Sequence, residues 1–123
     1  MDLNQVTISV HDFAASVAFY ETLGLKLIVS ARNSYARFEL PSGGATFSIH
    51  LDPQAQPNDT TLFFEVDDVD AKYADLVKAG IVFQAPPTDQ SYRWRTALFA
   101  DPTGNKLCLF RAGQDRRFPP WRL

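Results

Sequence analysis

VHDFAASVAFYETLGL (residues 10–25) returns 56 positions later as VDDVDAKYADLVKAGI (residues 66–81), and this repeat decides the fold. The identical positions include Val10 and Val66, Asp12 and Asp68, Ala18 and Ala74, and Gly24 and Gly80. Each copy is typical of a strand end, a helix begun by an aspartate, a glycine that ends the helix, and a second strand. A repeated unit that cannot bury its own apolar face must pack against its copy. We therefore expect two equivalent modules, with any functional site between them.

Composition predicts a single globular domain spanning residues 1–123. With 46% hydrophobic residues among 123, the chain can form one core but not two independent ones, so the two copies must share it. The net charge of −2 is not arranged as the basic stripe of a nucleic-acid-binding protein, so no nucleic-acid partner is expected. The start, MDLNQVTISV, is unlike a signal peptide, and no apolar run reaches the roughly 20 residues that cross a membrane. We expect a soluble, cytoplasmic protein with no membrane partner.

The first module covers residues 4–51 and is predicted to contain one helix and four strands. Polar and apolar side chains alternate in residues 5–10, as in a half-buried strand, with the odd-numbered residues on the polar face. Asp12 is predicted to cap a helix that runs to about Leu23. The other predicted strands are residues 25–29, 35–40 and 45–51, the last two joined by the turn 41–44.

Residues 52–59, DPQAQPND, are rich in turn formers and are predicted to link the first module to the second, residues 60–111. The second module is predicted to contain a helix over 69–79 and strands over 61–66, 81–84, 96–100 and 106–111. Its loop 85–94, which contains two aromatic residues, either forms a lid over the site or is an ordinary surface loop. The C-terminal tail, residues 112–123, contains two prolines and cannot continue a strand. Either this tail is disordered, or Phe118 and Trp121 dock on a neighbouring chain.

Three stretches resemble the vicinal oxygen chelate superfamily, the group of glyoxalases, bleomycin resistance proteins and extradiol dioxygenases: VTISVHDFAASVAFYETLGL, FFEVDDVDAKYADLVKAG and RTALFADPTGNKLCLF. The resemblance covers nearly all of residues 5–111, and the DPTGN turn followed by an alternating strand is its most specific element. It implies an α+β fold in which two βαβββ modules form a half-open curved-sheet barrel with the helices outside. Many members are dimers, so it also implies a homodimer, whose modules pair within a chain or are exchanged between chains.

The resemblance also implies where a metal would be held. Metalloenzymes of the family bind a divalent ion with His, Glu or Gln from the opening and closing strands of each module, and the matching positions here are Gln5, Ser48, Thr61 and Cys108. Neutral amide and hydroxyl groups bind Zn²⁺, Fe²⁺ or Mn²⁺ poorly without carboxylates or imidazoles beside them, so we expect no metal and no cofactor. A bulge in the first closing strand would bring His50 near Gln5 as a substitute ligand, and a divalent metal is therefore the alternative. Without the bulge, His50 meets solvent or a backbone carbonyl.

Glu65 and His50 are the weak candidates for a catalytic base, and the catalytic residues are otherwise unknown. A carboxylate on an aromatic-lined inward face can act as a general base. Alternatively, Glu65 pairs with Arg37 or Arg95, which we place on inward faces of their strands. Cys108 is the only cysteine, which excludes an intrachain disulfide, and it is expected to be a small core residue rather than a nucleophile.

Aromatic and polar side chains are predicted to share the inward faces of the strands. The predicted ligand-binding residues are Thr7, Tyr35, His50, Phe63, Trp94, Phe99 and Phe110. Aromatic walls with a few hydrogen-bonding groups suit a flat, partly apolar molecule. Because the bleomycin-resistance branch sequesters a drug without a catalytic metal, the resemblance implies a metal-independent, dimeric protein that binds an antibiotic-like or aromatic small molecule. The alternative is a divergent metal-dependent lyase, isomerase or dioxygenase of the glyoxalase type.

Overall fold

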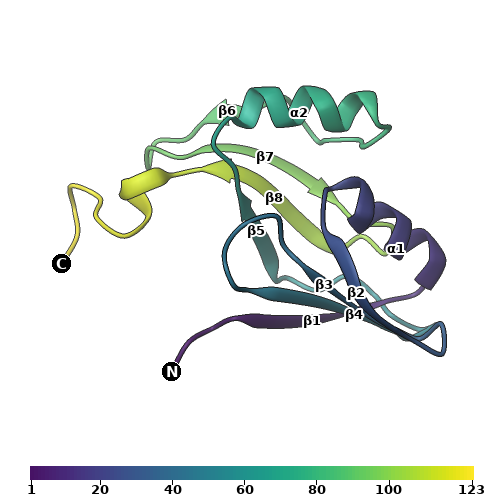
Figure 1. The fold of residues 1–123 in the computed structure, drawn as a ribbon. Coiled ribbons are helices and arrows are strands. Elements are labelled where there is room, and N and C mark those ends of the chain that lie inside the picture. The colour runs from purple at the N-terminus through teal and green to yellow at the C-terminus, as the bar shows by residue number, and fades with distance from the viewer. The chain divides into compact units, whose positions relative to one another are not determined.

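The computed structural model describes all 123 residues, which form two copies of one arrangement of a helix and a four-stranded sheet (Figure 1). The first copy contains β1 (Gln5–Val10), α1 (Phe13–Thr22), β2 (Lys26–Ala31), β3 (Tyr35–Glu39) and β4 (Thr46–Leu51). The second contains β5 (Thr61–Glu65), α2 (Val69–Lys78), β6 (Thr88–Asp89), β7 (Arg95–Ala100) and β8 (Lys106–Arg111), and a 3₁₀ helix, η1 (Gly113–Arg116), follows it.

The two sheets have the same topology. Their strand orders are β1-β4-β3-β2 and β5-β8-β7-β6, and in each the opening strand runs parallel to the closing strand while the other pairs are antiparallel. The predicted α+β class, with two βαβββ modules, is confirmed. The chain divides into two compact units, and the turn Asp101–Asn105 between β7 and β8 belongs to the first of them. The first unit is thus residues 1–58 with 101–105, and the second is residues 59–100 with 106–123.

Both helices begin and end at the predicted signals. The carboxylates of Asp12 and Asp68 accept the backbone N–H three residues further on, at 3.1 and 3.0 Å, so each satisfies one of the unpaired donors of a helix start. Gly24 and Gly80 follow the helices with φ of 101° and 98°, a left-handed conformation that glycine adopts without a Cβ clash. Neither helix is long and apolar enough to cross a membrane.

The core of the first unit centres on the α1 residue Tyr20. Its ring centroid lies 6.0 Å from that of Phe38 on β3 and 4.6 Å from that of Phe47 on β4, and all three side chains are buried. The Tyr20 hydroxyl donates a hydrogen bond of 2.7 Å to the carboxylate of Asp101, in the turn that completes this unit. Aromatic packing and one buried polar contact therefore hold helix, sheet and turn together.

Residues 81–84 do not form the predicted strand. A single bridge joins Phe83 to Phe99, and the fourth strand of the sheet is instead β6, within the segment predicted to be a loop. Pro86-Pro87 separates the bridge from β6. Because proline has no backbone N–H to donate to a ladder, these two residues interrupt the pairing, which resumes only at Thr88.

The tail has local structure, which argues against the alternative of a disordered tail. After η1, Phe118 and Trp121 remain 56% and 55% exposed. The guanidinium groups of Arg117 and Arg122 lie 5.5 and 4.5 Å from the centre of the Phe118 ring, within cation–π range. Docking of these aromatic residues on a neighbouring chain stays a prediction.

Candidate functional site

Strand register identifies the equivalent positions of the two sheets. Thr7 on β1 pairs with Ser48 on β4, and Phe63, which lies 56 positions after Thr7, pairs with Cys108 on β8. Ser48 and Cys108 therefore occupy matching positions, as the sequence predicted. Residues that pair across two strands point to the same face of a sheet. The pairs Thr7–Ser48 and Phe63–Cys108 therefore define the corresponding faces of the two sheets, and these faces carry the candidate site residues.

On the first sheet, this face carries a connected network of polar side chains. Gln5 Nε2 donates to the buried Ser48 Oγ at 2.9 Å, and the Thr46 hydroxyl donates to Gln5 Oε1. The Tyr35 and Ser48 hydroxyls share a hydrogen bond of 2.9 Å. Arg37 donates to the Tyr35 hydroxyl from Nε at 3.0 Å and from Nη2 at 2.8 Å. The network therefore runs from β1 across β4 to a cationic group on β3.

These contacts lower the pKa of the Tyr35 hydroxyl from its ordinary value. The hydrogen bond with Ser48 is the largest cause, and the two donors and positive charge of Arg37 act in the same direction. Because hydrogen bonds and a cation stabilise the phenolate relative to the phenol, the lowered pKa makes the Tyr35 hydroxyl a stronger hydrogen-bond donor than that of an isolated tyrosine.

His50 lies at the edge of this network and does not meet the condition for a metal ligand. It pairs in regular register with Ser9 and with Tyr35, and it is exposed. The first sheet has its register shift in β2, between Leu27 and Val29, and not in β4. The bulge on which the alternative role of His50 depended is therefore absent from β4, and Gln5 pairs with Thr46.

On the second sheet, the corresponding face carries an aromatic cluster, formed by Phe63, Tyr92, Trp94 and Phe110. The Trp94 ring lies 4.9 Å from Phe110, 5.8 Å from Phe63 and 5.6 Å from Tyr92, measured between centroids. Phe110 is buried, whereas Phe63 is 49% exposed and Tyr92 46% exposed. The cluster thus has a buried base and an exposed rim.

Phe99, predicted to line the inward face, is on the opposite side of its strand. It pairs with Leu107, one residue out of phase with the pair Leu98 and Cys108, and it is buried against the ring of Phe83 at 4.7 Å. The β7 residue on the aromatic face is Leu98, 43% exposed, which the sequence prediction missed. Leu98 is two residues from Thr96 and four from Trp94, and this even spacing is the sequence signal that places all three on one face of the strand.

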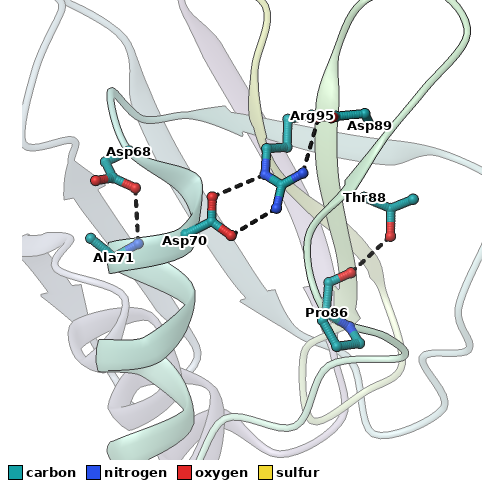
Figure 2. Close-up of polar contacts among 7 residues, drawn as sticks. All are labelled: Asp68, Asp70, Ala71, Pro86, Thr88, Asp89 and Arg95. Carbon is teal, nitrogen blue, oxygen red and sulfur yellow. Dashed lines mark hydrogen bonds and ion pairs between the residues drawn. The ribbon is translucent and has the colours of Figure 1, made fainter.

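Arg95 is also on the opposite face from the one predicted. Its guanidinium donates to the Asp70 carboxylate of α2 at 2.8 and 2.9 Å and to Asp89 of β6 at 3.0 Å, as Figure 2 shows. Arg95 therefore ties β6 and helix α2 to the sheet. It does not pair with Glu65, and the guanidinium of Arg37 donates instead to the Tyr35 hydroxyl.

Glu65 holds the start of the tail. One carboxylate oxygen accepts the backbone N–H groups of Ala112 and Gly113 at 2.6 and 2.8 Å, and Arg116 lies 3.8 Å from the other oxygen. A carboxylate engaged by three donors is poorly placed to accept a proton from a substrate. Glu65 is therefore better explained as a cap for η1 than as a general base.

Replacing Glu65 with alanine should release η1 and destabilise the protein by about 1–2 kcal/mol, since two amide donors lose a charged acceptor. Faster hydrogen exchange at the amides of Ala112 and Gly113, together with urea unfolding, measures the effect. Glu39→Ala is the matched control, because Glu39 forms only an exposed ion pair with Lys26. Unchanged exchange at both amides would contradict the capping role.

The residues at the family's metal positions do not fit a divalent ion. Gln5 Oε1, the one donor atom of that amide, already accepts from Thr46, and the Ser48 hydroxyl is fully buried within the network. Burial raises the pKa of the Cys108 thiol, which favours the protonated form over the thiolate that binds metals. Thr61 adds a neutral hydroxyl. Within each unit, no three His, Cys, Asp or Glu side chains gather as ligands.

Sequence and structure together identify the family. The model of the Glyoxalase/Bleomycin resistance protein/Dioxygenase superfamily matches residues 2–109, and the chain belongs to this superfamily. It is 33% identical over 128 residues to the uncharacterized protein YraH of Bacillus subtilis (strain 168), covering 90% of this chain and 98% of YraH.

Solved structures of this superfamily share the fold. A glyoxalase/bleomycin resistance protein/dioxygenase from Nocardioides is 26% identical, with a TM-score of 0.77 over 100% of this chain and 89% of that chain. A bleomycin-binding protein complexed with bleomycin is 20% identical, with a TM-score of 0.74 over 91% of this chain and 98% of that chain. At 20% identity this second likeness extends to the fold alone.

Proposed function

We propose that the protein binds and sequesters a flat, partly apolar small molecule on its aromatic cluster. The observation that carries this proposal is an exposed rim of aromatic rings, Phe63 and Tyr92, next to Trp94 and the buried Phe110. Aromatic surface left exposed beside hydrogen-bonding groups is typical of ligand sites. The bleomycin-binding protein of the same fold supports small-molecule binding as the kind of function, without identifying the ligand.

We further propose that binding needs no metal. The support is chemical: at the family's positions, the amide oxygen of Gln5 is occupied, and the thiol of Cys108 is buried with a raised pKa. The alternative, a divergent metal-dependent lyase, isomerase or dioxygenase, finds less support from this donor set. The homodimer stays a prediction.

Protein stripped of metal by a chelator should bind 2-naphthamide, a neutral two-ring probe, with a dissociation constant on the order of 1–100 µM. Calorimetric titration measures this, with metal-free bleomycin as a second probe. Added Zn²⁺ or Mn²⁺ should change the affinity by less than about twofold, since no donor set couples the metal to the aromatic cluster. The opposite result would favour the metalloenzyme: about one tightly bound transition metal per chain purified without chelator, with binding lost on its removal.

A further inference from the structure

Arg37 is a cation without a carboxylate partner on the polar face of the first sheet. Its Nε and Nη2 groups donate to the Tyr35 hydroxyl, and its guanidinium carbon lies 5.6 Å from the centre of the Tyr35 ring. Glu39, two residues along β3, pairs with Lys26 at 3.4 Å and not with Arg37. The side chain is partly exposed, so its positive charge is available to a solute.

Hydrogen-bond geometry leaves one edge of this guanidinium unused. Of its five N–H groups, the Tyr35 hydroxyl takes the one on Nε and one on Nη2, which leaves two on the edge formed by Nη1 and Nη2, one from each nitrogen. This edge has the two-pronged shape that matches the oxygens of a carboxylate or a phosphate. Because the Tyr35 hydroxyl is itself hydrogen-bonded to the buried Ser48, the Arg37 guanidinium is held in position before a ligand binds.

We propose that the Nη1–Nη2 edge of Arg37, on the first sheet, binds the oxyanion of a small molecule, either a carboxylate or a phosphate monoester. The inference goes beyond the proposed function, because it assigns to the first unit an anion site of its own. Tyr35 is a positioning residue in this arrangement. His50, exposed and paired in register with Tyr35, supplies a further N–H donor beside the site.

The proposal is tested with three matched probes that share one ring system: 2-naphthoate, 2-naphthyl phosphate and the neutral 2-naphthamide. The measurement is ¹⁵N NMR of the Arg37 Nε–H and Trp94 Nε1–H signals during titration, with Kd values from calorimetry. We expect the anions to shift the Arg37 signal and the amide to leave it unmoved. The larger response of naphthoate or naphthyl phosphate identifies which oxyanion is preferred.

Substitutions of Arg37 distinguish the contribution of its positive charge from that of its paired N–H donors. Arg37→Met should weaken binding of the preferred anion roughly 10- to 100-fold and leave the amide within about twofold, because only the charge-assisted hydrogen bonds are lost. Arg37→Lys, which keeps the charge but loses the planar fork, should lie between wild type and Arg37→Met. Tyr35→Phe should reduce the preference for anion over amide without removing binding of the amide. Circular dichroism and the thermal midpoint confirm that each variant is folded.

The outcomes distinguish this inference from the proposed function. If all three probes shift Trp94 with equal affinity and none shifts Arg37, the oxyanion site is refuted and aromatic binding stands. If the anions shift Arg37 and no probe shifts Trp94, the oxyanion site stands and the aromatic site is refuted. If neither signal responds to any probe, both are overturned. Wild-type anion affinity in Arg37→Lys would contradict the paired-donor geometry.

Discussion

Asp101→Ala should lower the free energy of unfolding by about 3–4 kcal/mol, a large effect for a substitution that removes no apolar core side chain. The Asp101 side chain is buried and accepts four hydrogen bonds. The backbone N–H groups of Thr103 and Asn105 donate to one oxygen at 3.0 and 2.9 Å, and Asn105 Nδ2 and the Tyr20 hydroxyl donate to the other at 3.0 and 2.7 Å. Truncation would leave these donors buried without an acceptor, which costs more than the bonds contribute.

Urea unfolding followed by circular dichroism and by fluorescence measures this loss. Tyr20→Phe removes one donor and keeps the acceptor, so it should cost less, about 1–2 kcal/mol. Asp67→Ala, at a fully exposed aspartate, is the control and should lie within about 0.5 kcal/mol of wild type. A loss below about 1 kcal/mol for Asp101→Ala would show that the turn is held mainly by other contacts.

The Tyr20–Asp101 contact also has a predictable pH dependence. Burial, reinforced by the neighbouring Asp101 carboxylate, raises the pKa of Tyr20 above its ordinary value. A group whose pKa is raised by folding contributes stability that is complete below its unfolded pKa, about 10 for tyrosine. This contribution should therefore be constant at neutral pH and decline only above pH 10, and it should disappear from the Tyr20→Phe variant.

Trp94→Ala should weaken binding of 2-naphthamide at least tenfold, the largest effect expected on binding of this neutral probe. Trp94 contacts every other member of the cluster: Phe63, Tyr92 and Phe110. Removing its ring takes away both a stacking surface and the packing that positions its neighbours. Aromatic pairs are worth about 0.5–1.5 kcal/mol beyond their buried area, so the loss of several exceeds a factor of ten in affinity.

Calorimetric titration of the variant measures this, with two controls. Trp94→Phe keeps a smaller ring and should retain most of the affinity. Val82→Ala changes a side chain that is 83% exposed and outside the cluster, so it should bind like wild type. Because Trp94 also packs on the buried Phe110, the variant's unfolding must be measured, and binding is compared only where it is folded. Wild-type affinity in folded Trp94→Ala would place the ligand elsewhere.

The two copies of the repeat share the same secondary structure and strand order, but they differ in the side chains on the candidate-site face. Aspartate caps and helix-ending glycines recur with the same geometry in both copies, and the two sheets have the same strand order. The equivalent positions on the two faces have diverged, with Thr7 against Phe63 and Ser48 against Cys108. One sheet consequently carries a polar network with a cation, and the other an aromatic cluster.

The sequence predictions failed at three places where the local sequence carries little signal for the structure that forms. Strand β7 reads RTALFA and carries apolar residues on both faces, so its own alternation does not assign Phe99 or Arg95 to a side, and the only signal was their odd spacing from Trp94. Strand β6 has two residues, too few to show a periodicity. Its pairing begins only after Pro86-Pro87, which have no backbone N–H to donate. The acceptor role of Glu65 toward backbone amides has no side-chain signature in the sequence.

The sequence by itself determined the family, the βαβββ repeat, the helix boundaries and the polar face of β1, because caps, glycine stops and alternation act over a few residues. Only the tertiary structure decided that Arg37 is held by Tyr35 without a carboxylate, that Glu65 caps the tail, and that Asp101 anchors its turn to Tyr20. These roles depend on partners brought together by folding. A charged side chain takes whichever partner the fold places within about 3 Å, and spacing along the chain does not encode that distance.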